Sequence, residues 1–235
     1  MNIGARLEVI GSMVPAGCVL ADIGTDHAYL PVHLIKTGRI ARAIAGDIAE
    51  GPCAAARTTI GMHGVRQQVE VRLGSGLKVL GAGEAGCIAI AGMGASTIID
   101  ILAADLEIAR AAQRLVLQPM TGAASLRRWL VANGWQLADE ALAEEGGHLY
   151  EIIAAEPCSD AKRKEYSDAE YEIGPLLLAN GGGLLAKQFA KQIANCETLL
   201  HNMEKSSQAK ASSKYAAASA MLRALEVLAD EYLRK

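Results

Sequence analysis

The chain has 235 residues and a formal net charge of −3, and 51% of its residues are hydrophobic although only 4% are aromatic. This length allows a full α/β core with roughly a hundred residues to spare, and no apolar run of about 18 residues would span a membrane. The N-terminal segment lacks the features of a signal peptide, so we expect a cytoplasmic protein, and the net charge gives no overall attraction to nucleic acid.

The five cysteines are widely separated and odd in number: Cys18, Cys53, Cys87, Cys158 and Cys196. Their spacing fits neither a metal site nor a disulfide framework. We therefore expect no metal, and we expect the cysteines to be buried as small hydrophobic residues.

The first elements predict a ligand loop. An amphipathic helix over residues 3–13 leads to an apolar strand over 18–23, which ends at Asp22-Ile23-Gly24, and a second helix follows over 28–37. A strand that stops at a glycine and re-enters as a helix brings backbone N–H groups to a ligand at the carboxyl edge of a sheet. Arg6 could fold back over this loop. With Gly24 as its single glycine, the loop does not match the dinucleotide fingerprint, and it could also be an ordinary strand-to-helix turn.

The next two strands add polar groups at the same edge. The strand over 42–45 ends in Gly46-Asp47, and an acid about twenty residues beyond Gly24 is placed to accept the ribose hydroxyls of a nucleoside. Asp47 could instead be a helix N-cap for the helix expected over 53–63. The third strand, 69–73, ends in Gly74-Ser75-Gly76, where Ser75 can accept a hydrogen bond without carrying charge.

The remaining elements complete an α/β sheet. A continuous apolar strand over 87–91 breaks at Gly92-Met93-Gly94 and leads to a helix over 96–103, which makes a second strand-to-helix switch near which a substrate would enter. A fifth strand, a helix and an antiparallel hairpin follow, over 114–118, 125–133, 135–143 and 148–155. An alternating βα series closed by such a hairpin is the pattern of the seven-stranded methyltransferase sheet.

The composition changes after Pro157. Long helical patterns over 185–203 and 215–232, joined by a polar segment, predict an antiparallel hairpin packed like a coiled coil. We therefore expect two domains, residues 1–156 and 157–235. Basic residues that could hold RNA, or could simply be solvated, form two clusters: Lys162, Arg163 and Lys164, and Lys205, Lys210 and Lys214.

Several stretches together resemble the bacterial tRNA (adenine(22)-N(1))-methyltransferase family. They are ADIGTDHAYLP at 21–31, GDIAEGP at 46–52, GSGL at 74–77, AGMG at 91–94, LQP at 117–119, LRRWLVANG at 126–134 and Tyr150-Glu151. The resemblance implies a Rossmann-like methyltransferase domain followed by a coiled-coil domain, S-adenosylmethionine as methyl donor, and adenine N1 in tRNA as acceptor.

The same motifs imply the residues of the site. We expect the cofactor to be bound by Arg6, Asp22, Gly24, Thr25, Asp47, Ile48, Ser75, Gly76, Ala91, Gly92 and Met93. The chain departs from the family pattern at Ser75, where an acid is usual, at Ala95, where glycine is common, and at Met120, where asparagine often follows LQP.

Adenine N1 has a free lone pair, so the reaction needs positioning more than acid–base help. The loop residues that could meet the base are Asp26, His27 and Tyr29: Asp26 could orient the adenine amino group and Tyr29 could stack on the ring. They could instead be a helix cap, a histidine bonded to nearby backbone and a core aromatic.

Two other functions fit the sequence. One is a methyltransferase that acts on a small molecule or another RNA, and the other is a non-catalytic Rossmann-like module that serves as an interaction platform. Asp22, Gly24 and Asp47 favour cofactor binding over the second of these.

Overall fold

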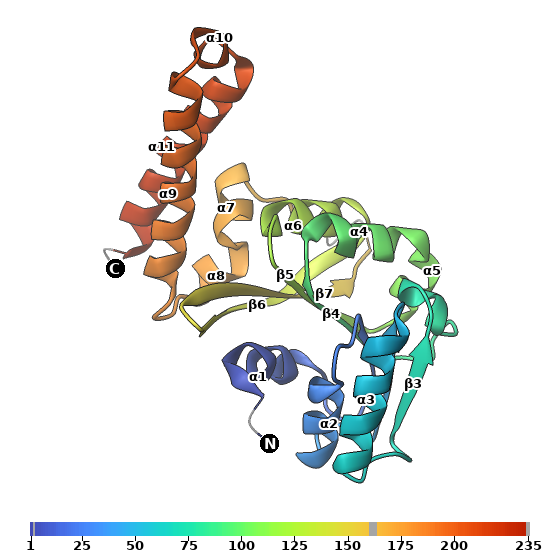
Figure 1. Ribbon diagram of the computed structural model, residues 1–235. Helices are drawn as coiled ribbons and strands as arrows, with labels where there is room; N and C mark the ends of the chain where they lie inside the picture. Colours follow the sequence, from blue (N-terminus) through green and yellow to red (C-terminus); the bar gives the residue numbers. More distant parts are fainter. Residues whose placement is uncertain (2, 160–163, 234–235) are drawn as a thin grey trace. The chain divides into compact units, whose positions relative to one another are not determined.

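A computed structural model describes residue 1, residues 3–159 and residues 164–233 of the chain (Figure 1). The chain divides into two compact units, residues 1–164 and 165–235. The boundary expected from the sequence, at residue 156, lies shortly before this division. Each unit is described below by itself.

The first unit is built on a seven-stranded mixed sheet with the order β3-β2-β1-β4-β5-β7-β6. The neighbours from β3 to β5 pair in parallel, whereas β7 pairs antiparallel with both β5 and β6. The strands are β1 Val19–Ile23, β2 Arg42–Asp47, β3 Val69–Leu73, β4 Cys87–Met93, β5 Arg114–Pro119, β6 Trp135–Glu145 and β7 His148–Pro157. The predicted Rossmann-like methyltransferase sheet is confirmed.

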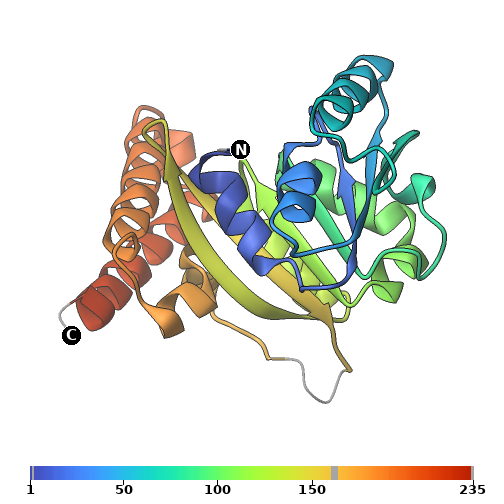
Figure 2. The ribbon, with the colours of Figure 1, turned by 90° about the horizontal axis from the view of Figure 1, so that it is seen from below.

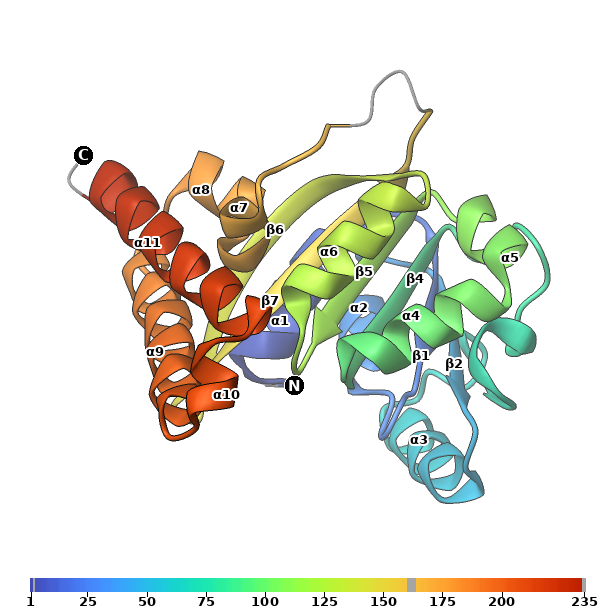
Figure 3. The same cartoon turned by 90° about the horizontal axis from the view of Figure 1, so that it is seen from above.

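Helices cover both faces of the sheet (Figures 2 and 3). They are α1 Gly4–Met13, α2 Tyr29–Lys36, α3 Glu50–Met62, the 3-10 turn η1 Gly76–Val79, α4 Ala95–Ala104, α5 Leu106–Ala111 and α6 Ala123–Ala132. The first three share one hydrophobic core with the sheet, through residues such as Ile10, Leu34 and Ile60. The helices α4 and α6 contact each other on the opposite face. The strand β4 is buried from Cys87 to Ile90, as expected for a central parallel strand.

The differences from the sequence prediction include a longer strand, an earlier helix start and an unpredicted helix. The strand β4 does not end at Ala91 but continues to Met93, because a bulge lets Met93 pair with Pro119 of β5. The helix α3 begins at Glu50, since Pro52 in its first turn loses only an N–H that would be unpaired in any case. The short helix α5 was not predicted.

The second unit is helical, with α7 Asp168–Ile173, α8 Pro175–Asn180, α9 Leu185–Glu204, α10 Ser207–Lys210 and α11 Ser213–Leu233. The long helices α9 and α11 pack side by side, and α7 contacts both (Figure 1). Their buried apolar residues include Leu185 and Phe189 on α9 and Ala218 and Leu225 on α11, at the spacing of four and seven that a helical hairpin requires. The predicted hairpin is confirmed, and its polar connector contains the additional turn α10.

All five cysteines are free thiols, of which Cys53 and Cys87 are buried. The prediction of burial is wrong for Cys18, Cys158 and Cys196, which are half-buried. Within the described parts of the chain, no group of three or more His, Cys, Asp and Glu side chains could hold a metal ion. None of the described helices is both long and apolar enough to cross a membrane.

Candidate cofactor and substrate site

The candidate residues gather at the carboxyl ends of the parallel strands. The sheet reverses its order between β1 and β4, which are hydrogen-bonded neighbours whose following helices leave on opposite faces. Such a reversal opens a crevice outside the carboxyl ends of the two strands, where ligands of α/β proteins bind. The loops after β1, β2, β3, β4 and β5 all meet at this edge.

Asp22, near the end of β1, has a carboxyl group with a raised pKa. Burial raises the pKa of its carboxyl group to about 6, against the opposing effects of a hydrogen bond from Thr25 and the positive charge of Arg6. A buried carboxylate in this state is stabilised when a cation binds beside it. The geometry of Asp22 therefore suits the positively charged part of a ligand.

The loop after Asp22 is closely packed. The N–H groups of Gly24 and Thr25 both donate to the carbonyl of Gly46, at 2.8 and 3.1 Å, so they fasten the loop to β2. These two N–H groups are therefore paired within the protein. Gly24 has φ +76°, a conformation that side chains rarely adopt, and a Cβ there would also displace the end of the Met93 side chain, so glycine is favoured at this position.

Ala28, which precedes the first residue of α2, adopts the left-handed conformation with φ 54°. Among the described residues it is the one non-glycine with a positive φ. Its N–H donates to Oγ1 of Thr25, at 3.2 Å. Thr25, rather than Asp26, thus satisfies the start of α2, and Asp26 is not the helix cap.

Asp26, His27 and Tyr29 lie on the outside of this loop. The rings of His27 and Tyr29 are stacked with centroids 5.1 Å apart, and Nε2 of His27 lies 3.5 Å from Oδ2 of Asp26. Tyr29 is 43% exposed, so the reading as a core aromatic is wrong. The three side chains are accessible to a large substrate.

The adenosine-binding candidates lie at the ends of β2 and β3. Oδ1 of Asp47 accepts a hydrogen bond from the Ala49 N–H at 2.8 Å, which leaves Oδ2 able to accept from a ligand. Ile48 is 73% exposed beside it, and Ser75 is also exposed. Ile101 of α4 packs against Gly76, since a Cβ at Gly76 would lie 3.3 Å from its side chain. These positions form an open polar and apolar surface of the kind that a nucleoside needs.

The Arg6 side chain lies close to residues of three strands, β4, β5 and β7. Its Nη1 donates to Oε1 of Gln118 at 2.8 Å, and the same oxygen accepts from the Gly92 N–H at 3.2 Å. Its guanidinium lies over the ring of Tyr150, 5.5 Å from the centroid. Gln118 is fully buried, and its Nε2 contacts Sδ of Met120 at 3.6 Å. The structure thus brings Arg6 to Gly92, at the end of β4.

Gln118 and Tyr150 were not among the predicted site residues. Both belong to motifs that carry the family resemblance, LQP and Tyr150-Glu151, but the sequence assigns them no role. Two of the departures from the family also lie here. Ala95 is buried with its methyl group 3.2 Å from the position of a Cβ on Gly122, and Met120 is 51% exposed at the end of β5.

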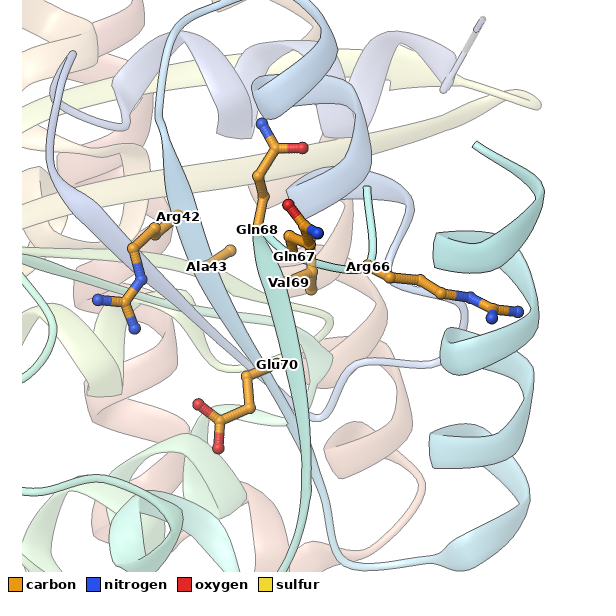
Figure 4. Close-up of a pocket in the computed structure, with 7 residues that line it drawn as sticks. All are labelled: Arg42, Ala43, Arg66, Gln67, Gln68, Val69 and Glu70. Carbon is orange, nitrogen blue, oxygen red and sulfur yellow. The ribbon is translucent and has the colours of Figure 1, made fainter. Parts of the chain in front are cut away.

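A pocket of about 380 Å³ lies at the opposite end of the sheet (Figure 4). It is lined by Arg42, Ala43, Arg66, Gln67, Gln68, Val69 and Glu70, which surround the starts of β2 and β3. At the other ends of these strands, Asp47 is the last residue of β2 and Ser75 follows β3. The pocket is therefore not part of the candidate site.

Comparison with known proteins gives a consistent family. Residues 20–226 match the family model described as tRNA (adenine(22)-N(1))-methyltransferase. The Bacillus subtilis tRNA (adenine(22)-N(1))-methyltransferase is 35% identical over 201 residues, which cover 85% of this chain and 84% of the relative.

Solved structures of similar proteins match this chain over nearly its whole length. The crystal structure of the B. subtilis m1A22 tRNA methyltransferase superposes with a TM-score of 0.85 at 31% identity, covering 97% of this chain and 98% of that one. A Streptococcus pneumoniae protein in complex with S-adenosyl-L-methionine has a TM-score of 0.84 at 31% identity, covering 97% and 99%. Together with the sheet order and the polar loops at its carboxyl edge, these matches show that the chain belongs to the S-adenosylmethionine-dependent tRNA (adenine(22)-N(1))-methyltransferase family.

Proposed function

We propose that this chain transfers the methyl group of S-adenosylmethionine to N1 of adenine 22 in tRNA, using the crevice at the carboxyl ends of β1, β2 and β4. The observation that carries the assignment of residues is the arrangement of Asp22 and Arg6 on one side of this edge and Asp47 on the other. When bound, S-adenosylmethionine supplies an electrophilic methyl group on its sulfonium sulfur.

The amino-acid end of the cofactor requires one negative and one positive partner. Asp22 offers a carboxylate whose pKa is raised to about 6 by burial, so a bound ammonium group would offset the cost of its charge. Arg6 lies over Gly92 and is held there by Gln118, with further N–H groups that can bind a carboxylate. This pair suits a zwitterion.

The nucleoside end requires a hydrogen-bond acceptor for the ribose and a surface for the adenine. Oδ2 of Asp47 supplies the acceptor, and Ile48, Ser75 and Gly76 flank it. Ser75 offers a neutral hydroxyl where the family usually has an acid, so recognition of the adenine amino group relies on an uncharged hydrogen bond.

The methyl transfer needs no base. The lone pair of adenine N1 forms the new N–C bond while the C–S bond breaks and its electron pair stays on sulfur, so the adenine becomes cationic and no proton moves beforehand. The protein's task is to hold N1 in line with the methyl group and to accommodate the positive charge. Because N1 lies on the Watson–Crick edge, the base must be unpaired or flipped out. Asp26, His27 and Tyr29 are exposed where such a base would arrive.

The test is methylation of unmodified tRNA followed by digestion to nucleosides. We expect 1-methyladenosine as the methylated product. N6-methyladenosine or a methylated guanosine as the only product would contradict the proposed acceptor. Cofactor binding without any RNA methylation would favour the small-molecule alternative.

A further inference from the structure

The helix α1, which carries Arg6, is poorly stabilised by its own sequence. It has only ten residues, no acid in its first turn and no base in its last turn, and the side chain of its N-cap residue, Ile3, makes no capping hydrogen bond. A helix of this length is marginal on its own. Its position must therefore be fixed by groups from elsewhere in the chain.

Charged side chains from distant elements supply these groups at both ends. At the start of α1, Oε2 of Glu145 accepts a hydrogen bond from the Arg6 N–H at 3.0 Å. At its end, Arg39 donates to the carbonyls of Ser12 and Val14 at 2.6 and 2.7 Å, and Arg114 donates to that of Met13 at 3.2 Å. The negative charge lies at the N-terminus and the positive charges at the C-terminus, which is the favourable arrangement for the helix dipole.

Glu145 and the first turn of α1 fit closely. Gly4 has φ +80°, and a Cβ on it would lie 2.4 Å from Oε2 of Glu145, so the carboxylate occupies the space that a side chain would need. Glu145 is the last residue of β6, at the turn of the hairpin. One carboxylate thus joins the hairpin to the turn of α1 that bears Arg6.

Arg6 donates this hydrogen bond from its backbone N–H and reaches the site with its side chain. Its guanidinium meets Gln118 and Gly92 at the carboxyl edge and lies over Tyr150. If the first turn of α1 were released, the backbone of Arg6 would no longer be fixed. Ligand binding would then be weaker, because the guanidinium would lose conformational entropy on binding.

We propose that Glu145 is a positioning residue for cofactor binding, which acts by fixing the first turn of α1 so that Arg6 is held over Gly92. This inference rests on the proposed function, because Arg6 is taken to bind the carboxylate of S-adenosylmethionine.

The test is a thermodynamic cycle measured by calorimetric titration of S-adenosylmethionine into the full-length protein. Arg6→Ala removes a charged hydrogen bond and is expected to weaken binding about tenfold or more. Glu145→Ala is expected to weaken it about three- to tenfold, through loss of positioning. The double variant should bind like Arg6→Ala alone, because Glu145 acts through Arg6.

Conservative and matched variants separate positioning from a general effect on folding. Glu145→Gln keeps an oxygen that accepts from the Arg6 N–H, so it should bind within about threefold of the wild type. Glu144→Ala removes the same charge from the exposed neighbouring residue and should bind normally. Thermal unfolding of each variant checks that the proteins are folded at the titration temperature.

Normal affinity of folded Glu145→Ala, or additive losses in the double variant, would overturn the inference while leaving the proposed function intact. A wild-type protein that fails to bind S-adenosylmethionine would overturn the proposed function and this inference with it.

Discussion

At the scale of single residues, Asp22 is a carboxyl group whose pKa is raised by burial. Its folded pKa of about 6 lies above the ordinary value of 3.8 because burial disfavours the charge. A raised carboxyl pKa means that the folded state binds its proton more tightly than the unfolded state does. In the protein without ligand, the free energy of unfolding should therefore fall as the pH rises from about 4 to about 6. A cation bound beside Asp22 would offset this loss.

This state of Asp22 predicts a pH-dependent affinity for S-adenosylmethionine. Below pH 6 the carboxyl group is protonated and cannot pair with an ammonium group, so lowering the pH from 7 to 5 should weaken binding by up to about tenfold. Calorimetric titration across this range measures the effect. Asp22→Asn should bind weakly with little pH dependence, whereas Asp26→Asn, which alters an exposed acid, should keep the wild-type profile. A pH-dependent Asp22→Asn protein would assign the titration to another group.

Asp47 predicts a second effect on the cofactor. If its carboxylate accepts the ribose hydroxyls, Asp47→Ala should weaken binding by about 1.5–3 kcal/mol, the usual range for a hydrogen bond to a charged group. Asp100→Ala, at an exposed acid on α4, is the matched control and should leave the affinity unchanged. Equal affinities for the folded Asp47→Ala and wild-type proteins would remove Asp47 from the site.

At the scale of elements, a cluster of buried charged side chains joins α6 to the hairpin formed by β6 and β7. Nε of Arg127 donates to Oε1 of Glu140 at 2.5 Å, and its Nη2 lies 2.9 Å from Oε2 of Glu151. All three side chains are buried. The cluster connects one helix to both β6 and β7, the strands that carry Glu145 and Tyr150.

Removing the cation of this cluster should be costly. Arg127→Ala leaves two carboxylates buried without it, so the free energy of unfolding should fall by about 3–5 kcal/mol in urea denaturation. Arg57→Ala breaks an exposed pair with Glu50 and should change stability by less than about 1 kcal/mol. A small effect of Arg127→Ala would show that the carboxylates take up protons or water at little cost.

The elements could be predicted from the sequence where the signal is local. The strand over 69–73 alternates with period two, and the helix end at Gly134 has the positive φ, 95°, that glycine allows. The extension of β4 to Met93 could not be predicted, because it depends on pairing with Pro119. The bonds of Arg6 to Glu145 and Gln118 join residues 139 and 112 positions apart, so no local pattern reveals them.

The candidate site shows the same division between residues that a local pattern predicts and residues that only a distant contact reveals. Asp22, Gly24 and Asp47 lie at the carboxyl ends of two neighbouring parallel strands. These ends meet at one edge of a sheet, so the strand positions are enough to place the three residues together. Gln118 and Tyr150 were missed because their contribution lies in a contact with Arg6, which only the packed structure supplies.

At the scale of the whole molecule, the chain has a net charge of −3, although the proposed substrate, tRNA, is a polyanion. Local clusters of basic residues must therefore provide the attraction. Of the two predicted clusters, Lys162 and Arg163 lie outside the described residues. Lys205, Lys210 and Lys214 are all exposed around α10.

We expect these three lysines to contribute to tRNA binding. Replacing all three with glutamine should weaken tRNA binding and reduce the slope of log affinity against log salt, since fewer counterions are released. S-adenosylmethionine affinity should not change. Lys36→Gln/Lys78→Gln, at exposed lysines of the first unit, is the control and should keep the wild-type slope. An unchanged slope for the triple variant would mean that these lysines are only solvated.

The central claim is that the chain methylates N1 of adenine 22 in tRNA. The most direct measurement is transfer of labelled methyl groups from S-adenosylmethionine to two unmodified tRNA transcripts that differ only in adenine or guanine at position 22. The account predicts label in the adenine transcript alone, recovered as 1-methyladenosine, and little transfer by the Asp47→Ala protein at low cofactor concentration. Equal labelling of both transcripts, or no labelling of either by a protein that binds S-adenosylmethionine, would contradict it.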